Sequence, residues 1–113
     1  MNDCLFCRIA EGDIPAELIY RDKDLLAFRD INPQAPLHVL IIPRKHIARV
    51  EDLDSADTEL AGKMILAAKK IAKEQGLKTG YRLVFNNGPD AGQEVQHIHL
   101  HLMGGRRFHW PAG

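Results

Sequence analysis

The chain has 113 residues, a length that suits a single domain, residues 1–113, with a hydrophobic core. Its 15 basic and 15 acidic residues cancel, which argues against a strongly basic nucleic-acid binder and against an acidic tail protein. The first residues lack the pattern of a secretory signal, and no apolar run approaches the roughly 20 residues of a membrane span. We therefore expect a soluble, cytoplasmic protein with no nucleic-acid or membrane partner.

The first half of the chain predicts a β-hairpin and a central strand. Aliphatic and aromatic runs at residues 18–20 and 25–28 flank a polar segment, which is the pattern of a hairpin. A proline-bounded turn at residues 30–36 leads into residues 37–42, which are rich in β-branched and aliphatic side chains and end at Pro43.

The second half predicts one long helix followed by two strands. Asp54 or Ser55 can cap a helix that runs to about Gln75. Its apolar side chains recur at helical spacing, namely Leu60, Met64, Ala68 and Ile71, with Ala61, Ile65 and Ala72. Residues 81–85 predict a strand and residues 86–93 a loop before the last strand. Mostly antiparallel strands with one long helix on one face give an α+β domain.

Three histidines alternate with aliphatic residues in His97-Ile98-His99-Leu100-His101-Leu102. Because side chains alternate faces along a strand, we expect the imidazoles on one face and the aliphatic side chains in the core. Imidazole titrates near neutral pH and acts as nucleophile, acid, base or metal ligand. The row therefore predicts a catalyst or a metal site, with separately satisfied histidines as the ordinary alternative.

The loop at residues 86–94 favours catalysis on phosphate over a metal hydrolase. Backbone N–H groups of a glycine-rich loop beside a strand end can bind an anion, although an ordinary turn fits the loop equally well. Cys4 and Cys7 form a CxxC pair, which in a reducing cytosol fits half a metal site or two thiols better than a structural disulfide.

Residues 92–106, which contain the histidine row, resemble the signature of the histidine triad (HIT) superfamily. Residues 30–36, 42–46, 80–82 and 109–113 resemble its Hint branch, so the resemblance extends over nearly the whole chain. It implies a HIT-like α+β fold with a mostly antiparallel sheet, one long helix and a short N-terminal helix. It also implies a homodimer in which the two sheets join.

The resemblance implies hydrolysis of purine nucleoside 5′-phosphoramidates, derivatives of AMP or GMP, to the nucleoside monophosphate and an amine. His99 matches the nucleophile, which forms a nucleotidyl-histidine intermediate, and His101 matches a donor to the phosphate. His97 and His38 match supporting catalytic histidines. No cofactor is implied for catalysis.

The resemblance also assigns nucleotide-binding residues beside His99 and His101. Asp30 matches the acceptor for the ribose hydroxyls, although alone it fits a turn-forming aspartate. Ile31, with Phe6 and Ile9 as neighbours, would cover the base. The other matches lie on the phosphate and leaving-group sides, namely Asn86, Gly92, Gln93 and Glu94. Glu94 departs from the serine of eukaryotic Hint proteins, and a carboxyl group there can protonate the leaving amine.

The resemblance also implies roles for two further parts of the chain. Some bacterial relatives bind structural zinc through a CxxC pair and two histidines, which match Cys4, Cys7, His46 and His97 here; buried cysteines without metal are the alternative. The ending His109-Trp110 matches a segment that reaches the neighbouring subunit's site in Hint proteins, where it would tune amine selectivity.

Three other functions stay open on the sequence. Within the superfamily, the alternative is dinucleoside polyphosphate hydrolysis. From other classes, the chain fits a nucleotide-binding regulatory module or a metal-binding protein.

Overall fold

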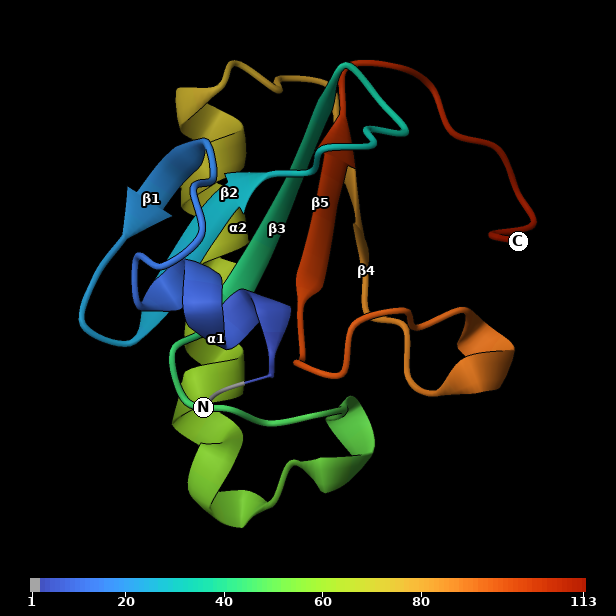
Figure 1. Ribbon diagram of the computed structural model, residues 1–113. Coiled ribbons are helices and arrows are strands. Elements are labelled where there is room, and N and C mark those ends of the chain that lie inside the picture. The colour runs from blue at the N-terminus through green and yellow to red at the C-terminus, as the bar shows by residue number, and fades with distance from the viewer. Residues whose placement is uncertain (1–2) are drawn as a thin grey trace.

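A five-stranded sheet forms the centre of the computed structural model, which describes residues 3–113. The strand order is β1-β2-β3-β5-β4, and every neighbouring pair is antiparallel. The strands are β1 (Leu18–Arg21), β2 (Leu25–Arg29), β3 (Leu37–Pro43), β4 (Tyr81–Val84) and β5 (Leu100–Gly104). Figure 1 shows β3 and β5 side by side in the middle of the sheet. The predicted hairpin and central strand are confirmed.

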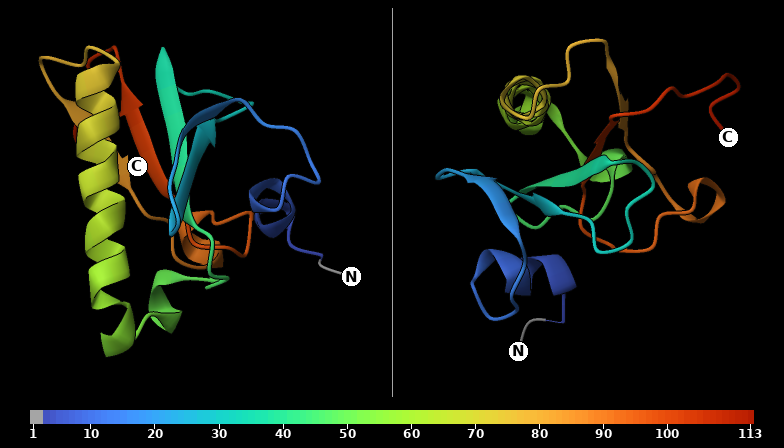
Figure 2. Two further views of the ribbon diagram at one scale, coloured as in Figure 1. Left: turned by 90° about the vertical axis from the view of Figure 1, so that its left-hand side faces the viewer. Right: turned by 90° about the horizontal axis from the view of Figure 1, so that it is seen from above.

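Two α-helices lie on opposite sides of the sheet, α1 (Leu5–Ala10) and α2 (Thr58–Glu74) (Figure 2). The start of the long helix was predicted at Asp54 or Ser55, and a 3-10 turn at Ser55–Asp57 leads into α2 there. The Asp54 carboxylate accepts from the Ala56 N–H at 2.8 Å, and Asp57 accepts from the Asp54 N–H at 3.2 Å. These two bonds satisfy backbone groups that the first turn of a helix leaves open.

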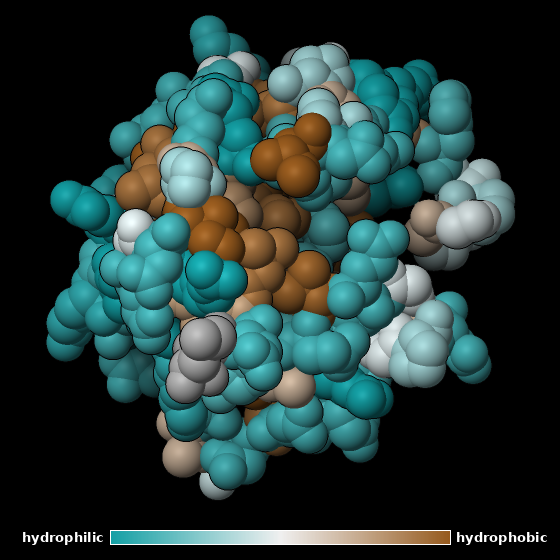
Figure 3. Space-filling model, in the orientation of Figure 1, coloured by the Kyte–Doolittle hydropathy of each residue, from teal (hydrophilic) through white to brown (hydrophobic). Residues whose placement is uncertain are grey.

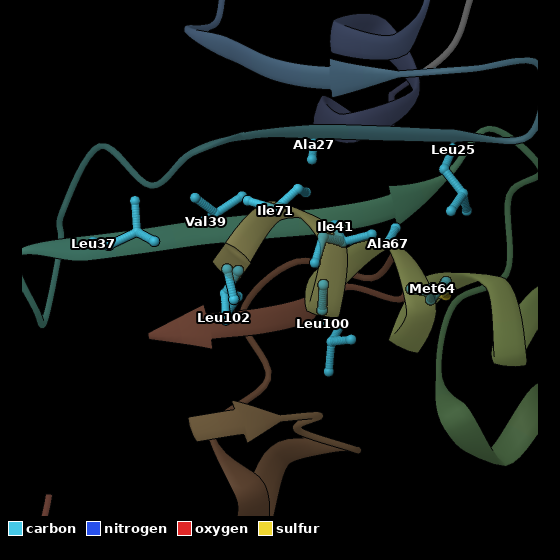
Figure 4. Packing of buried hydrophobic residues seen from close by; sticks show 12 residues of the cluster. Leu25, Ala27, Leu37, Val39, Ile41, Met64, Ala67, Ile71, Leu100 and Leu102 are labelled. Atoms are coloured by element: carbon cyan, nitrogen blue, oxygen red, sulfur yellow. The ribbon is translucent and has the colours of Figure 1, made fainter. Parts of the chain in front are cut away.

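The main hydrophobic core lies between α2 and the sheet (Figure 4). It contains Leu25, Ala27, Leu37, Val39, Ile41, Met64, Ala67, Ala68, Ile71, Ala72, Leu100 and Leu102. The expected position of Ile65 in the apolar stripe is wrong, because its side chain is 48% exposed. Ile65 lies about 100° around the helix from the buried Met64, and Ala67 takes part in the core instead.

A second cluster covers the other face of the sheet, beneath α1. It consists of Phe6, Leu26, Phe28, Leu40 and Ile42. The space-filling view from this side shows an apolar area surrounded by hydrophilic surface (Figure 3). Since Leu40 pairs with His101 and His38 with Met103, both histidines face the same side of the sheet as this cluster.

The histidine segment enters the sheet later than expected. Strand β5 begins at Leu100, so His97 and His99 precede it. Pairing with β3 ends at Ile41 and Leu100, and the Ile98 N–H instead donates to the Ile47 carbonyl at 2.6 Å. Alternation nevertheless holds, because Leu100 and Leu102 enter the core under α2 while His99 packs against Phe6 on the opposite face. Within residues 3–113, no helix combines the length and the apolar character that a membrane crossing requires.

Candidate active site

The middle histidine of the row, His99, has one ring nitrogen fixed by the backbone. Its Nδ1 lies 2.7 Å from the carbonyl oxygen of His97. A carbonyl can only accept, so Nδ1 carries the ring proton and Nε2 of the neutral ring keeps its lone pair. The side chain is 8% exposed and packs edge-on against Phe6 with ring centroids 5.1 Å apart. The backbone therefore fixes the orientation of the His99 ring and assigns Nδ1 as the donor atom.

A chain of hydrogen bonds fixes the protons of His38 and His101. The backbone N–H of Gln34 donates to His38 Nδ1 at 3.0 Å, which leaves the single proton of the neutral His38 ring on Nε2. That Nε2 lies 2.9 Å from His101 Nδ1, so His38 donates and His101 accepts. The proton of the neutral His101 ring is then on its own Nε2.

The Nε2 of His101 is buried, and among the described residues it has no hydrogen-bond partner. Burial lowers the pKa of His101 from 6.5 to about 4, so the ring is neutral at pH 7. Burial also lowers the pKa of His38, which the Asp30 carboxylate partly opposes. His101 lies next to His99, with ring centroids 5.0 Å apart. The result is a buried N–H donor beside His99 that has no protein partner among the described residues.

Asp30 and Ile31 border this group at the end of β2. Asp30 Oδ1 accepts from the Asn32 N–H at 2.8 Å, the turn that its sequence position predicts, and Oδ2 lies 3.4 Å from His38 Nε2. Ile31 is fully exposed, at 101% of its reference area. Phe6 is buried against His97 and His99, and Ile9 packs on the cluster beneath α1. Phe6 thus supports the histidines, while Ile9 packs on the apolar cluster beside it.

The loop that precedes the histidines is organised by Gln93, which is buried. Its Oε1 accepts from the Gly88 N–H at 2.9 Å, and its Nε2 donates to the carbonyls of Ala48 (2.8 Å) and Val95 (3.0 Å). Both amide protons are therefore used by the backbone. The Gln93 side chain, which the resemblance assigns to nucleotide binding, joins Gly88 and Val95 of its own stretch of chain to Ala48.

The other expected phosphate-side residues lie around that loop. Gly92 has a left-handed backbone, with φ at +82°, and it is exposed, as is Glu94. Asn86 is half-buried just after β4, and continuing the register from Val84 and His101 places it opposite His99. Of these residues, Asn86 is the one that the strand register places beside His99.

The first histidine of the row, His97, belongs to a different cluster. It is 0% exposed, and its Nε2 donates to the Pro43 carbonyl at 2.8 Å, so its Nδ1 has the lone pair. That Nδ1 lies 3.3 Å from Cys4 Sγ, 3.4 Å from Cys7 Sγ and 3.2 Å from His46 Nδ1. Cys4 caps the start of α1 and Cys7 lies in its first turn, so one short helix presents both thiols to the two imidazoles.

These four side chains fit a tetrahedral zinc ion. Their ligand atoms all lie within 4.8 Å of one another. Zinc bonds of ~2.0–2.3 Å in a tetrahedron place neighbouring ligand atoms ~3.3–3.8 Å apart, close to the spacing around His97 Nδ1. The thiols can ionise, and the His97 ring already presents a lone pair. Cys4, Cys7, His46 and His97 are therefore the residues that can hold a metal ion.

A second group, Asp30, His38 and His101, also brings ligand atoms within 4.8 Å. Here the proton chain opposes metal binding, because the Gln34 N–H places the proton of His38 on Nε2, the atom that a cation would need. This group fits a hydrogen-bond chain and not a cation site.

The C-terminal segment after β5 is anchored by arginines. The guanidinium groups of Arg82 and Arg106 lie 4.9 and 4.1 Å from the centre of the Phe108 ring, and Arg82 also donates to the His109 carbonyl at 2.9 Å. Beyond this anchor Trp110 is 85% exposed. Figure 1 shows the segment leaving the sheet on the side of β4.

Three groups that organise the site were not predicted. The Gln34 N–H and the Pro43 and His97 carbonyls belong to the main chain, which carries no residue-specific sequence signal. Gln34 and His38 lie four residues apart in the sequence, and this spacing alone does not predict the hydrogen bond between them.

Known proteins resemble this chain along its whole length. The model of the HIT domain family matches residues 11–108. An uncharacterized HIT-like protein from Synechocystis sp. is 46% identical over 99% of this chain and 98% of its own length. A crystal structure of a HIT family hydrolase from Legionella pneumophila has a TM-score of 0.97 and 57% identity, over 98% of this chain and 100% of that one.

A zinc-bound histidine triad family protein from Mycobacterium smegmatis has a TM-score of 0.82 and 37% identity, over 92% of this chain and 76% of that one. The similarity to a HIT family hydrolase supports a hydrolase. With a family match over most of its length and relatives of this identity, the chain belongs to the HIT domain family.

Proposed function

We propose that this protein hydrolyses purine nucleoside 5′-phosphoramidates to the nucleoside monophosphate and an amine. The observation that carries the proposal is the bond between His99 Nδ1 and the His97 carbonyl, which leaves the lone pair on His99 Nε2. A neutral imidazole is a competent nucleophile at neutral pH. As a member of the Hint branch, the protein would form a nucleotidyl-histidine intermediate.

The reaction divides into two displacements at phosphorus. His99 Nε2 forms a bond to the α-phosphorus, the P–N bond to the amine breaks, and the amine leaves with its electron pair and takes up a proton. Water then attacks the nucleotidyl group, the His99–phosphorus bond breaks, and the monophosphate is released. Glu94 is exposed in the loop that precedes the histidines, and its carboxyl group or a water molecule bound to it would supply the proton to the amine.

The neighbouring residues have complementary tasks. The His101 Nε2–H is directed to a non-bridging phosphate oxygen, where charge develops, and backbone N–H groups around Gly92 and Asn86 assist. Supported by His38, the ring stays neutral and so donates without adding a charge. Asp30 accepts from the ribose hydroxyls, and the exposed Ile31 covers the base. These base contacts are apolar and do not distinguish adenine from guanine.

We further infer a structural zinc ion and a homodimer. Four protein ligands complete the coordination of zinc, so the ion would stabilise the fold around His97 and leave catalysis to the histidines. The homodimer would form with the sheets joined, and His109-Trp110 would extend to the partner subunit's site.

The test is a comparison of the wild type with His99→Ala, using adenosine and guanosine phosphoramidates. We expect the variant to lose turnover while it retains AMP binding in calorimetry, because the ring supplies the nucleophile and not the main binding contacts. Rapid quench and mass spectrometry of the wild type should place the nucleotidyl group on His99. Turnover by the variant, or an adduct on another residue, would rule out the mechanism. Dinucleoside polyphosphates assayed in parallel test the alternative substrate class.

A further inference from the structure

We propose that a cavity at one end of the sheet binds an oligophosphate, at a site separate from the histidines. The cavity has a volume of about 690 Å³ and is lined by residues 76–82 and 105–108, none of which is a histidine. It lies where the connection from α2 to β4 meets the segment after β5, and the pairing of Tyr81 with Gly104 places both at the same end of the sheet (Figure 1). The inference does not depend on the proposed function.

The lining of this cavity is strongly cationic. Among the described residues it contains Lys78, Arg82, Arg106 and Arg107, and it contains no aspartate or glutamate. The ion pairs of residues 3–113 involve other side chains, so these four charges are not neutralised within the described part of the chain. Basic and acidic residues cancel over the whole sequence, yet four of the 15 basic residues gather here. Like charges in one cavity create a positive potential that attracts an anion.

The two arginines nearest the Phe108 ring are oriented before any ligand binds. The guanidinium groups of Arg82 and Arg106 lie 4.9 and 4.1 Å from the centre of that ring. Arg82 donates to the His109 carbonyl at 2.9 Å, and Arg106 Nε donates to the Gln34 carbonyl at 3.0 Å. A guanidinium has five N–H donors, so each arginine keeps donors for a ligand. Because the side chains are already held, binding orders fewer rotamers and costs less entropy.

The chemistry of the lining favours an oligophosphate over an apolar ligand or a single carboxylate. The volume lies within the roughly 300–1,000 Å³ of small-molecule sites, but such sites are mostly apolar and this one is cationic. Guanidinium groups match phosphate oxygens in pairs, and the Lys78 ammonium adds a point charge. Four positive charges are neutralised best by several linked phosphates. Tyr81, which is 39% exposed, offers its ring to a base where the phosphates belong to a nucleotide.

The experiment titrates the full chain with tripolyphosphate in a calorimeter, with and without saturating AMP to occupy the proposed nucleotide site. We expect one tripolyphosphate per chain in both cases, with an affinity that falls as the ionic strength rises. In 1H–15N spectra, the shifted amides should lie in residues 76–82 and 105–108. Adenosine triphosphate, titrated in parallel with AMP present, distinguishes a free oligophosphate from the phosphate chain of a nucleotide, because it binds more tightly only if a base contact adds to the phosphate contacts.

The double variant Lys78→Ala/Arg107→Ala removes two exposed cations of the cavity. Neither side chain makes a hydrogen bond to another described residue, since Arg107 contributes only its carbonyl, so the fold should be preserved. We expect tripolyphosphate affinity to fall about ten-fold, about three-fold for each exposed ion pair lost. Lys69→Ala/Lys73→Ala is the matched control, because it removes the same charge from exposed positions of α2 that do not line the cavity.

Four results would overturn the proposal. The first is the absence of tripolyphosphate binding, and the second is an equal loss of affinity in both double variants, which would indicate a general charge effect. The third is binding that saturating AMP abolishes, with shifts confined to the histidine segment. The fourth is an affinity that falls as the protein concentration rises, which would show that a second copy of the chain covers the cavity. None of these results bears on phosphoramidate hydrolysis, which is measured separately.

Discussion

His101 is held neutral by burial, and this has a consequence for stability. Its pKa is about 4 in the folded chain against 6.5 for an ordinary histidine, so the unfolded chain binds more protons between these pH values. The free energy of unfolding therefore falls as the pH drops from 6.5 through 4. Between pH 7 and pH 4, we expect the free energy of unfolding of His101→Asn to fall by about 2–3 kcal/mol less than that of the wild type.

Urea unfolding at a series of pH values measures this difference. Burial also lowers the pKa values of His38 and His97, so the free energy of unfolding of the variant should still decrease somewhat as the pH falls. Parallel curves for wild type and variant would show that His101 is not held neutral by the fold.

Gln93 gives a second prediction at the residue scale. Gln93→Met leaves the Gly88 N–H and two carbonyls without their partner, which should lower the free energy of unfolding by about 2–4 kcal/mol. Gln93→Glu should lower the free energy of unfolding more than Gln93→Met does, because a carboxylate would face the Ala48 and Val95 carbonyls. Kinetics separate this role from direct binding. A positioning role lowers kcat and stability together, whereas unchanged stability with a large rise in KM would favour contact with nucleotide.

At the scale of elements, two glycines form a matched pair, one in the loop before the histidines and one directly after β5. Gly105, after β5, has φ at +93°, and a Cβ there would lie 2.9 Å from Pro36 Cβ; Gly92 has φ at +82° and no atom within 4 Å of such a Cβ. Gly92→Ala should therefore cost about 1 kcal/mol from backbone strain alone, and Gly105→Ala about 2–3 kcal/mol because a contact is added. Denaturant unfolding compares the two variants. Equal losses of unfolding free energy in the two variants would show that Pro36 moves aside freely.

The sequence predicted the elements better than the contacts of the site. Hydrophobic periodicity located the hairpin, β3 and α2, since burial on one face sets that periodicity. It placed the start of the histidine strand too early, because alternation continues through His97 and His99 although pairing with β3 begins only at Leu100. The proton positions of the imidazoles depend on main-chain groups such as the Gln34 N–H, and on chain segments that only the fold brings together.

At the scale of the molecule, β4 is one of the two edge strands of the sheet, and we propose it as the edge where a second copy pairs. Its outer side is open among the described residues, and a cavity of about 690 Å³ beside it is lined by Tyr81, Arg82 and Phe108. We expect sedimentation equilibrium to give twice the chain mass of 12.7 kDa. Deletion of residues 108–113 should change amine selectivity more than stability. A monomer at all concentrations, or an unchanged selectivity profile, would contradict this assembly.

The position of β5 in the sheet also bears on the order in which the protein is completed during synthesis. Among the strands of residues 3–113 it is the last to be made, yet it lies between β3 and β4. A nascent chain that ends before Leu100 has no partner for β4 and leaves one edge of β3 exposed. The strand that closes this gap also brings in His101 and follows directly on His99. We therefore expect the ability to bind nucleotide and the completed sheet to emerge from the ribosome together, with no partly active precursor.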